Sequence, residues 1–234
     1  LQGLGWSLEQ LSITLPALLP GEPAAAELSG EFRRDTLAIV FTGPIRLGRA
    51  GLDSPLAFEG AGRIRSEGLD APWKLAFTGS MALSQPPRTL DFDTLSLAGE
   101  PPLPDFGGRG SLSLGDTLAM RFEGALPAWP EGWPPLPAPL DASTSPVALV
   151  LDYRGADDFS DPLSLDATRD EAVLRSRVPV PALLAWLEDD GGQPLPPLTG
   201  TLQAPRLVVE GVELEGVRIS VEEAADEAPS AGEQ

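Results

Sequence analysis

The sequence predicts a mainly β protein that folds as one antiparallel meander of short strands. Three observations lead to this prediction. Apolar and polar residues alternate with a period of two over most of the chain, and clusters of turn-forming residues separate these runs. An aromatic residue followed two positions later by glycine also recurs along the chain. The 26 prolines and 25 glycines among the 234 residues argue against long helices.

The recurring aromatic-x-glycine pattern indicates a degenerate β-repeat. Side chains alternate between the faces of a strand, so each aromatic ring and its glycine project to the same side. A glycine there leaves a gap that lets the sheet bend, or that an aromatic ring covers. The alternative is that a long meander with many turn glycines produces some copies by chance. The copies are Phe41-Thr-Gly43, Phe58-Glu-Gly60, Phe77-Thr-Gly79 and Phe122-Glu-Gly124, with a looser one at Tyr153-Arg-Gly155.

The first half of the chain is expected to form a continuous series of strands. The alternation predicts strands over residues 8–15, 26–34, 37–47, 56–64 and 71–83, followed by one over 90–97. In the last of these the parity of the apolar residues changes at Thr94, which predicts a β-bulge. Residues 110–114 and 117–126 are expected to form a hairpin around Gly115 and Asp116.

The second half begins with a segment rich in proline and tryptophan, over residues 129–145. Its five prolines between Trp129 and Leu140 exclude a central strand or a helix. We interpret it as a stiff connector whose two tryptophans pack back on the sheet, in preference to a polyproline recognition segment. Strands are expected again over 147–153, 163–167 and 173–178, then one short helix over 181–190, opened by Pro181 and ended by Gly191 and Gly192.

The predicted organisation therefore has four parts. Residues 1–128 form the β-meander with the aromatic-x-glycine repeats, and residues 129–145 form the connector. Residues 146–222 form a C-terminal β segment that contains the short helix, with short apolar steps over 198–221. Residues 223–234 are small, acidic and polar, which is typical of a disordered tail.

Composition excludes several classes of function. The net charge of −19 makes nucleic acid a poor partner, because binding phosphates requires Lys and Arg. The chain has no His and no Cys, so zinc sites of the usual type, thiol chemistry and Ser-His or Cys-His nucleophiles are excluded. The acidic groups around Phe159 and over 188–190 lack the stagger of a calcium loop and are interpreted as solvated turns. We expect no catalytic residues, no cofactor and no metal ion.

The sequence shows no secretory signal and no apolar stretch of the ~20 residues needed to span a bilayer. Residue 1 is Leu, and the chain opens within an alternating pattern. We therefore expect a fragment from which an N-terminal part, with any signal or membrane anchor, has been removed.

Most of residues 1–222 resembles the AsmA-like family. The resemblance is carried by L-x-G-x-L-x-A-P-x-L over residues 198–207, by G-V-x-L-x-G-V-x-I over 211–219, by residues 165–187, and by the aromatic-x-glycine strands and the Trp-Pro connector. It implies a periplasmic protein that is tethered to the inner membrane by a segment this chain lacks. It also implies a long curved sheet, an open groove or half-barrel, that takes phospholipid acyl chains. Such proteins are linked to phospholipid transport to the outer membrane and to outer-membrane assembly.

The first hypothesis is thus a curved antiparallel sheet that binds or guides lipid without catalysis. The second is a closed β-sandwich or barrel that binds other proteins of the cell envelope, and a weaker third is a hydrolase that depends on carboxylates alone. Sequence alone does not decide whether the apolar faces meet a ligand or each other. The candidate groove residues are Ile39, Phe41, Leu56, Phe58, Leu75, Phe77, Met120, Phe122, Leu149 and Leu151.

Overall fold

The computed structural model shows an almost entirely β protein. It describes residues 2–3, 6–15, 19, 21–34, 36–49, 51, 53–66, 69–131, 133, 135–182, 197–209 and 211–222. The strands are β1 (Gln2–Gly3), β2 (Trp6–Thr14), β3 (Ala24–Arg34), β4 (Leu37–Leu47), β5 (Asp53–Ser66), β6 (Leu69–Ala82), β7 (Arg88–Gly99), β8 (Phe106–Leu114), β9 (Leu118–Leu126), β10 (Val147–Gly155), β11 (Pro162–Arg169), β12 (Ala172–Pro179), β13 (Thr199–Val209) and β14 (Val212–Val221).

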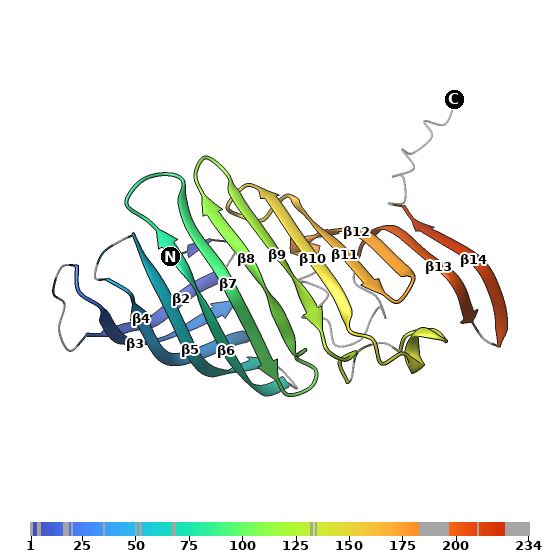
Figure 1. Ribbon diagram of the computed structural model, residues 1–234, viewed down its shortest axis with the longest axis horizontal. Helices are drawn as coiled ribbons and strands as arrows, with labels where there is room; N and C mark the ends of the chain where they lie inside the picture. Colours follow the sequence, from blue (N-terminus) through green and yellow to red (C-terminus); the bar gives the residue numbers. More distant parts are fainter. Residues whose placement is uncertain are drawn as a thin grey trace, which may run out of the picture.

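All of these strands belong to one antiparallel sheet in which each strand pairs with the next one in the chain. The first and last strands do not pair with each other, so the sheet is not closed into a barrel. Because the described strands form a single sheet, the described part of the chain is not a sandwich of two sheets. The predicted fold, a mainly β chain with a long curved antiparallel sheet, is confirmed (Figure 1).

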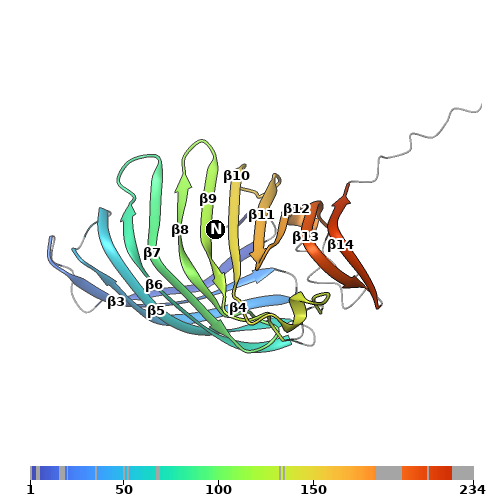
Figure 2. The ribbon, with the colours of Figure 1, turned by 45° about the vertical axis from the view of Figure 1, so that its right-hand side comes forward.

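The sheet curls strongly across its strands. In both ribbon views β2 to β4 pass behind β7 to β9, so one face of the sheet is turned inward (Figures 1 and 2). We call this the inner face and define it by cross-strand pairs such as Ile45 with Phe58, Phe58 with Phe77, and Phe122 with Leu151. The opposite, outer face carries the charged side chains of the same strands.

The predicted bulge near Thr94 is confirmed. The β6–β7 register shifts between Thr78 and Gly79, and the β7–β8 register shifts between Phe92 and Leu95. The extra residue lets Phe92 and Leu95 both project to the inner face although they are three positions apart. A second irregularity, between Glu9 and Ser12 in β2, includes Gln10 with a φ of 50°.

The connector between β9 and β10 runs beside the sheet while these two strands pair over nine residues. The Trp129 and Trp133 rings lie edge to face with centroids 5.2 Å apart, and Trp133 Nε1 donates a hydrogen bond to the carbonyl of Pro102 at 2.9 Å. Farther along, the backbone of Ala138 forms an isolated antiparallel bridge with Val208 of β13. The connector therefore continues the sheet at a point where β13 extends past its pairing with β12.

Within the described residues there is little helix. One turn of 3-10 helix, η1, spans Leu140–Ala142. The helix predicted over residues 181–190 falls largely outside the described residues, although Val180 to Ala182 are helical. The predicted disordered tail over residues 223–234 also lies outside them.

Candidate functional site

All ten candidate groove residues lie on the inner face. They come from five strands and are linked by direct pairs, among them Ile39 with Ile64, Phe58 with Phe77, and Met120 with Leu112. The strands are β4 for Ile39 and Phe41, β5 for Leu56 and Phe58, β6 for Leu75 and Phe77, β9 for Met120 and Phe122, and β10 for Leu149 and Leu151.

A row of phenylalanine rings crosses the middle of this face, and we call it the ring ladder. It consists of Phe58, Phe77, Phe92 and Phe122, with ring centroids 5.5, 5.1 and 5.6 Å apart in that order. Such separations suit favourable aromatic pairs. The ladder spans β5 to β9, and its last step crosses from β7 to β9 over the intervening strand β8.

Glycines on the inner face make the ladder possible. Gly110 of β8 pairs directly with Phe122, whose ring lies where a side chain on residue 110 would be. Because residue 110 has no Cβ, the Phe122 ring can reach across β8 to Phe92. Gly62 of β5 is covered in the same way by Trp73, whose Cζ2 atom would lie 2.6 Å from a Cβ at that position. The expectation that rings cover glycine gaps is thus met, with the ring often supplied by the next strand.

Phe92 is a member of the ladder that was not among the candidate residues. It has no glycine two positions later, so the aromatic-x-glycine pattern misses it. The signal that could have found it is its place in the alternation of residues 90–97, together with the bulge that follows it.

Most of the inner face is only partly buried. Leu56 and Phe58 are 6% exposed, but the other eight candidate residues are half-buried. Many fully buried side chains sit near strand ends, such as Leu118, Leu126 and Val147. Within the described residues, one cluster of buried residues is found, formed by Ala172, Ala204 and Leu207 and covered by Leu140 of the connector. The middle of the sheet thus lacks the fully buried core that a second layer would create.

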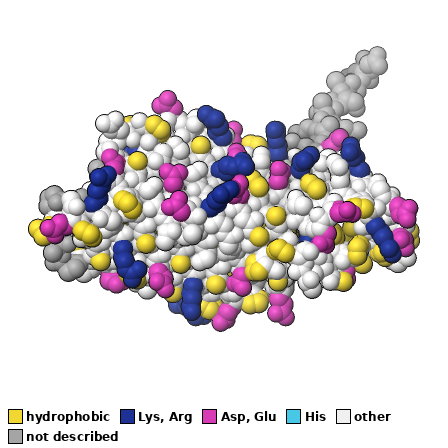
Figure 3. Space-filling model, in the orientation of Figure 1, with side chains coloured by type: hydrophobic (Ala, Val, Ile, Leu, Met, Phe, Trp, Pro, Cys, Tyr) yellow, Lys and Arg dark blue, Asp and Glu magenta, His cyan; other side chains and the backbone are white. Residues whose placement is uncertain are grey.

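The outer face is polar and is tied together by ion pairs between neighbouring strands. Arg63 contacts Asp70 at 2.7 Å, Arg121 contacts Asp152 at 3.0 Å, and Arg109 pairs with Glu123. The hydrogen bond from Arg63 lowers the pKa of the exposed Asp70 carboxyl. Figure 3 shows charged side chains of both signs spread over the visible face, with hydrophobic side chains scattered between them.

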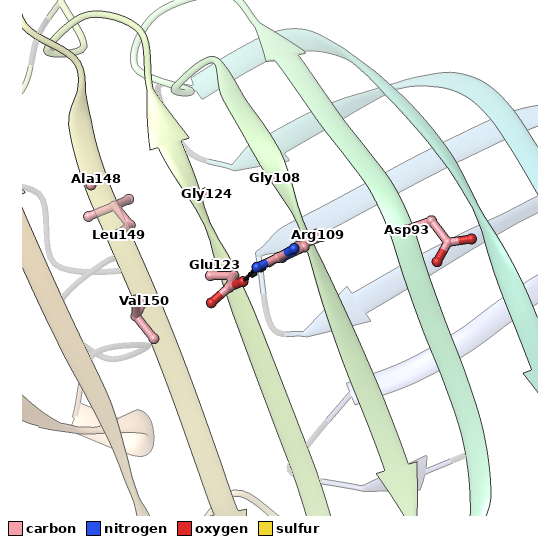
Figure 4. A pocket seen from close by; sticks show the side chains of 8 residues that line it. All are labelled: Asp93, Gly108, Arg109, Glu123, Gly124, Ala148, Leu149 and Val150. Atoms are coloured by element: carbon pink, nitrogen blue, oxygen red, sulfur yellow. Dashed lines mark hydrogen bonds and ion pairs between the residues drawn. The ribbon is translucent and has the colours of Figure 1, made fainter.

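Two shallow hollows are lined mainly by outer-face residues, and their linings also include Leu149 in one and Phe58 and Phe77 in the other. The larger, of about 440 Å³, is lined by Asp93, Arg109, Glu123 and Val150 among others, and the Arg109–Glu123 ion pair lies across it (Figure 4). The smaller, of about 210 Å³, lies over β4 to β7. The charges of Arg109 and Glu123 pair with each other, whereas Asp93 lies apart from this pair (Figure 4).

The aspartates around Phe159 accept hydrogen bonds from the backbone of their own turn. Asp161 accepts a hydrogen bond from the Ala156 N–H at 3.0 Å, and Asp158 accepts one from Ser160 N–H at 2.9 Å. Hydrogen bonds from Ser160 lower the pKa of Asp158. Tyr153 is buried below this turn and donates to the carbonyl of Ala156 at 2.6 Å, and its burial raises its pKa. These contacts explain Asp158 and Asp161 as parts of a turn.

In the part of the chain that the structure describes, no three acidic, His or Cys side chains gather where a metal ion could bind. No described helix is long and apolar enough to cross a membrane. Comparison with protein-family models, curated proteins and solved structures finds no match. The fold and its inner face define the class of protein: an open, single-layer antiparallel β-sheet with a partly exposed apolar concave face.

Proposed function

We propose that this chain is a non-enzymatic segment that binds or guides lipid, with phospholipid acyl chains lying on the inner face. The observation that carries the proposal is the ring ladder, which lies in the middle of a single sheet and is partly exposed at Phe77, Phe92 and Phe122. Monomeric soluble proteins rarely expose a large continuous apolar patch without using it. Acyl chains suit this surface because they require apolar contact and no fixed hydrogen-bond partners.

The open form of the sheet also supports guiding rather than enclosing a ligand. A closed cavity would fix the size of its ligand, whereas a face that runs from β3 to β12 gives an acyl chain similar contacts at many positions. The aromatic and leucine side chains repeat from strand to strand, so moving along the face exchanges one apolar contact for another. Such movement needs no chemical step.

The cellular setting that we propose comes from the resemblance to the AsmA-like family over residues 198–219 and the earlier motifs. In that setting the chain acts in the periplasm, as part of a protein tethered to the inner membrane. Its role is in phospholipid transport to the outer membrane or in outer-membrane assembly, with other envelope proteins as further partners. The charge of −19 also disfavours nucleic acid as a partner.

The test compares Phe77→Asp with Thr78→Asp. Phe77 is half-buried in the ring ladder, whereas the neighbouring Thr78 is exposed on the outer face, so both variants add the same charge to the same strand. We expect both to stay folded by circular dichroism, since water can reach either carboxylate. We expect co-purified phospholipid, measured by native mass spectrometry, to be lost in Phe77→Asp and kept in Thr78→Asp.

Two outcomes would overturn the proposal. If the unsubstituted chain carries no phospholipid and takes none up from vesicles of phosphatidylethanolamine and phosphatidylglycerol, the inner face does not bind lipid. If Phe77→Asp stays folded and keeps its lipid, the ring ladder is not the binding surface. Should Phe77→Asp unfold, Phe77→Ser serves as the milder variant, because it removes the ring without adding a charge.

A further inference from the structure

β14 is the last strand in the order of the described sheet. It pairs with β13 over nine residue pairs, and no other described strand lies on its far side. Large apolar side chains are unusually exposed along it: Val212 is 59% exposed, Leu214 41%, Ile219 42% and Val221 46%. Apolar residues of central strands such as Ile39, Leu75 and Leu149 are half-buried, and each of these strands has a neighbouring strand on both sides.

The β14 edge lacks most of the features that protect natural edge strands. Edge strands are commonly short, or carry proline, a bulge or charged side chains, especially lysine. β14 is ten residues long and contains no proline and no lysine, and its charged side chains are Glu213, Glu215 and Arg218. Its one irregularity is Gly216, with a φ of 59°, which lies between two regular halves. A strand of this kind is suited to pair with another strand by backbone hydrogen bonds, as in β-strand addition.

The side chains of β14 define what the partner strand must carry. In the first half of β14 the apolar Val212 and Leu214 alternate with Glu213 and Glu215. In the second half Ile219 and Val221 continue the inner face through their pairs with Leu202 and Gly200, and Arg218 is the charged residue. A partner strand would therefore need apolar residues along its length, with basic residues between them opposite Glu213 and Glu215. Glu213 already contacts Arg206 of β13 at 2.7 Å, so the acidic side chains of β14 have one basic neighbour on the adjacent strand. Cross-strand pairs of opposite charge stabilise a sheet, and like charges oppose pairing.

From this pattern we infer that β14 is a docking edge for a β-strand of another protein, one that alternates apolar residues with Lys or Arg. The apolar residues would lie opposite the apolar side chains of β14, and the basic residues would lie opposite Glu213 and Glu215. A second copy of this chain fits less well, because each copy has a net charge of −19 and brings glutamates to the same edge. Strand addition here does not require lipid binding, so it goes beyond the proposed function.

The experiment uses the whole chain and synthetic ten-residue peptides. In the first peptide valine alternates with lysine, in the second valine alternates with glutamate, and a third has the composition of the first with its lysines and valines in two blocks. Binding is followed by fluorescence anisotropy, and its place by hydrogen exchange of the β14 amides. We expect the alternating lysine peptide to bind at least tenfold more tightly than the other two and to protect the amides of Val212–Val221.

Variants locate the site. Ile219→Lys adds a charge to the docking edge, and Leu114→Lys adds one to an apolar side chain that is 38% exposed at the end of β8, away from this edge. We expect the first to weaken peptide binding about tenfold and the second to leave it unchanged. The double variant Glu213→Lys/Glu215→Lys should shift the preference toward the glutamate peptide. Phe77→Asp should bind the lysine peptide normally, which separates this test from that of lipid binding.

Three results would overturn the inference. One is equal affinity for the alternating and block lysine peptides, which would mean attraction by net charge alone. Another is unchanged β14 hydrogen exchange in the presence of saturating lysine peptide. The third is a stable dimer in light scattering that Ile219→Lys dissociates, because the edge would then be occupied by a second copy.

Discussion

Gly110 offers the sharpest test of how the inner face is packed, through Gly110→Ala. A Cβ at this position would lie 2.6 Å from the backbone carbonyl oxygen of Arg121 and 2.9 Å from Cε1 of Phe122. Both distances are well below the optimum of about 3.5–4.0 Å between non-bonded carbon atoms. The ring can turn aside, but the carbonyl belongs to the paired strand β9 and moves only with the sheet. Overpacking of this kind costs about 1–3 kcal/mol.

The control is Gly107→Ala in the same strand. Nothing lies within 4 Å of a Cβ at residue 107, and its φ is not in the left-handed region. Replacing such a glycine by alanine stabilises a protein by about 0.4–1 kcal/mol, chiefly because the unfolded chain loses freedom. The two alanine variants are therefore expected to move stability in opposite directions, although they differ by three positions in one strand.

Urea unfolding followed by circular dichroism measures the difference. With an m-value of about 2–3 kcal/mol/M, a cost of about 2 kcal/mol lowers the midpoint by roughly 0.7–1 M. Adding Phe122→Ala to Gly110→Ala should recover part of the loss, because it removes the ring but leaves the carbonyl. If Gly110→Ala is as stable as Gly107→Ala, the Phe122 ring does not rest on Gly110, and the ladder as described is wrong.

Two further predictions concern single polar residues. Asp53 accepts hydrogen bonds from Ser84 and from the Leu83 N–H, and these hold its pKa below the ordinary value of 3.8. The contribution of Asp53 to stability is therefore complete above pH 3.8. It is lost as the pH falls through the lower pKa of the folded state. Asp53→Asn should lower the melting temperature at pH 7 and lose this difference at the most acidic pH, and an equal difference at every pH would contradict the assignment. Arg169 is 7% exposed and donates to the Ser143 carbonyl, but its Nε and Nη1 atoms are buried without a partner. Arg169→Met should therefore change the free energy of unfolding by less than about 1 kcal/mol, whereas Arg169→Ala, which leaves a cavity, should cost about 2 kcal/mol or more.

The period-two alternation predicted most of the strands and the composition of the inner face. The strand predicted over residues 37–47 matches β4, and the parity change at Thr94 located a bulge. These two predictions succeeded because the apolar side chains of a strand must share one face. A shift of the strand by one residue would move all of them to the other face, so the alternation fixes the position of the strand. The alternation predicts which residues of a strand share a face, and the ten candidate residues accordingly all lie on the inner face.

What the sequence did not predict depends on contacts between distant residues or on glycine. Residues 106–109 were not assigned to a strand because glycine is depleted in strands. In the structure they begin β8, where Gly108 lies close to Gly124 of β9. The bridge between Ala138 and Val208 joins residues with no shared local pattern. Alternation also looks the same for a face covered by a second layer and for one left open, so the open inner face could not be deduced.

The high negative charge and the open inner face act together, and this leads to a last prediction. A partly exposed apolar face favours association, while a net charge of −19 keeps copies apart at neutral pH. Near pH 4.2, the isoelectric point, that repulsion disappears, and we expect light scattering to show more association at pH 4.2 than at pH 7. Circular dichroism at pH 4.2 checks that the sheet is retained. Phe77→Asp should associate less than Thr78→Asp at the same pH, because the aspartate at residue 77 interrupts the ring ladder. If the two variants associate equally while folded, the contacts between copies form elsewhere, and charge alone does not explain how this open sheet stays dispersed.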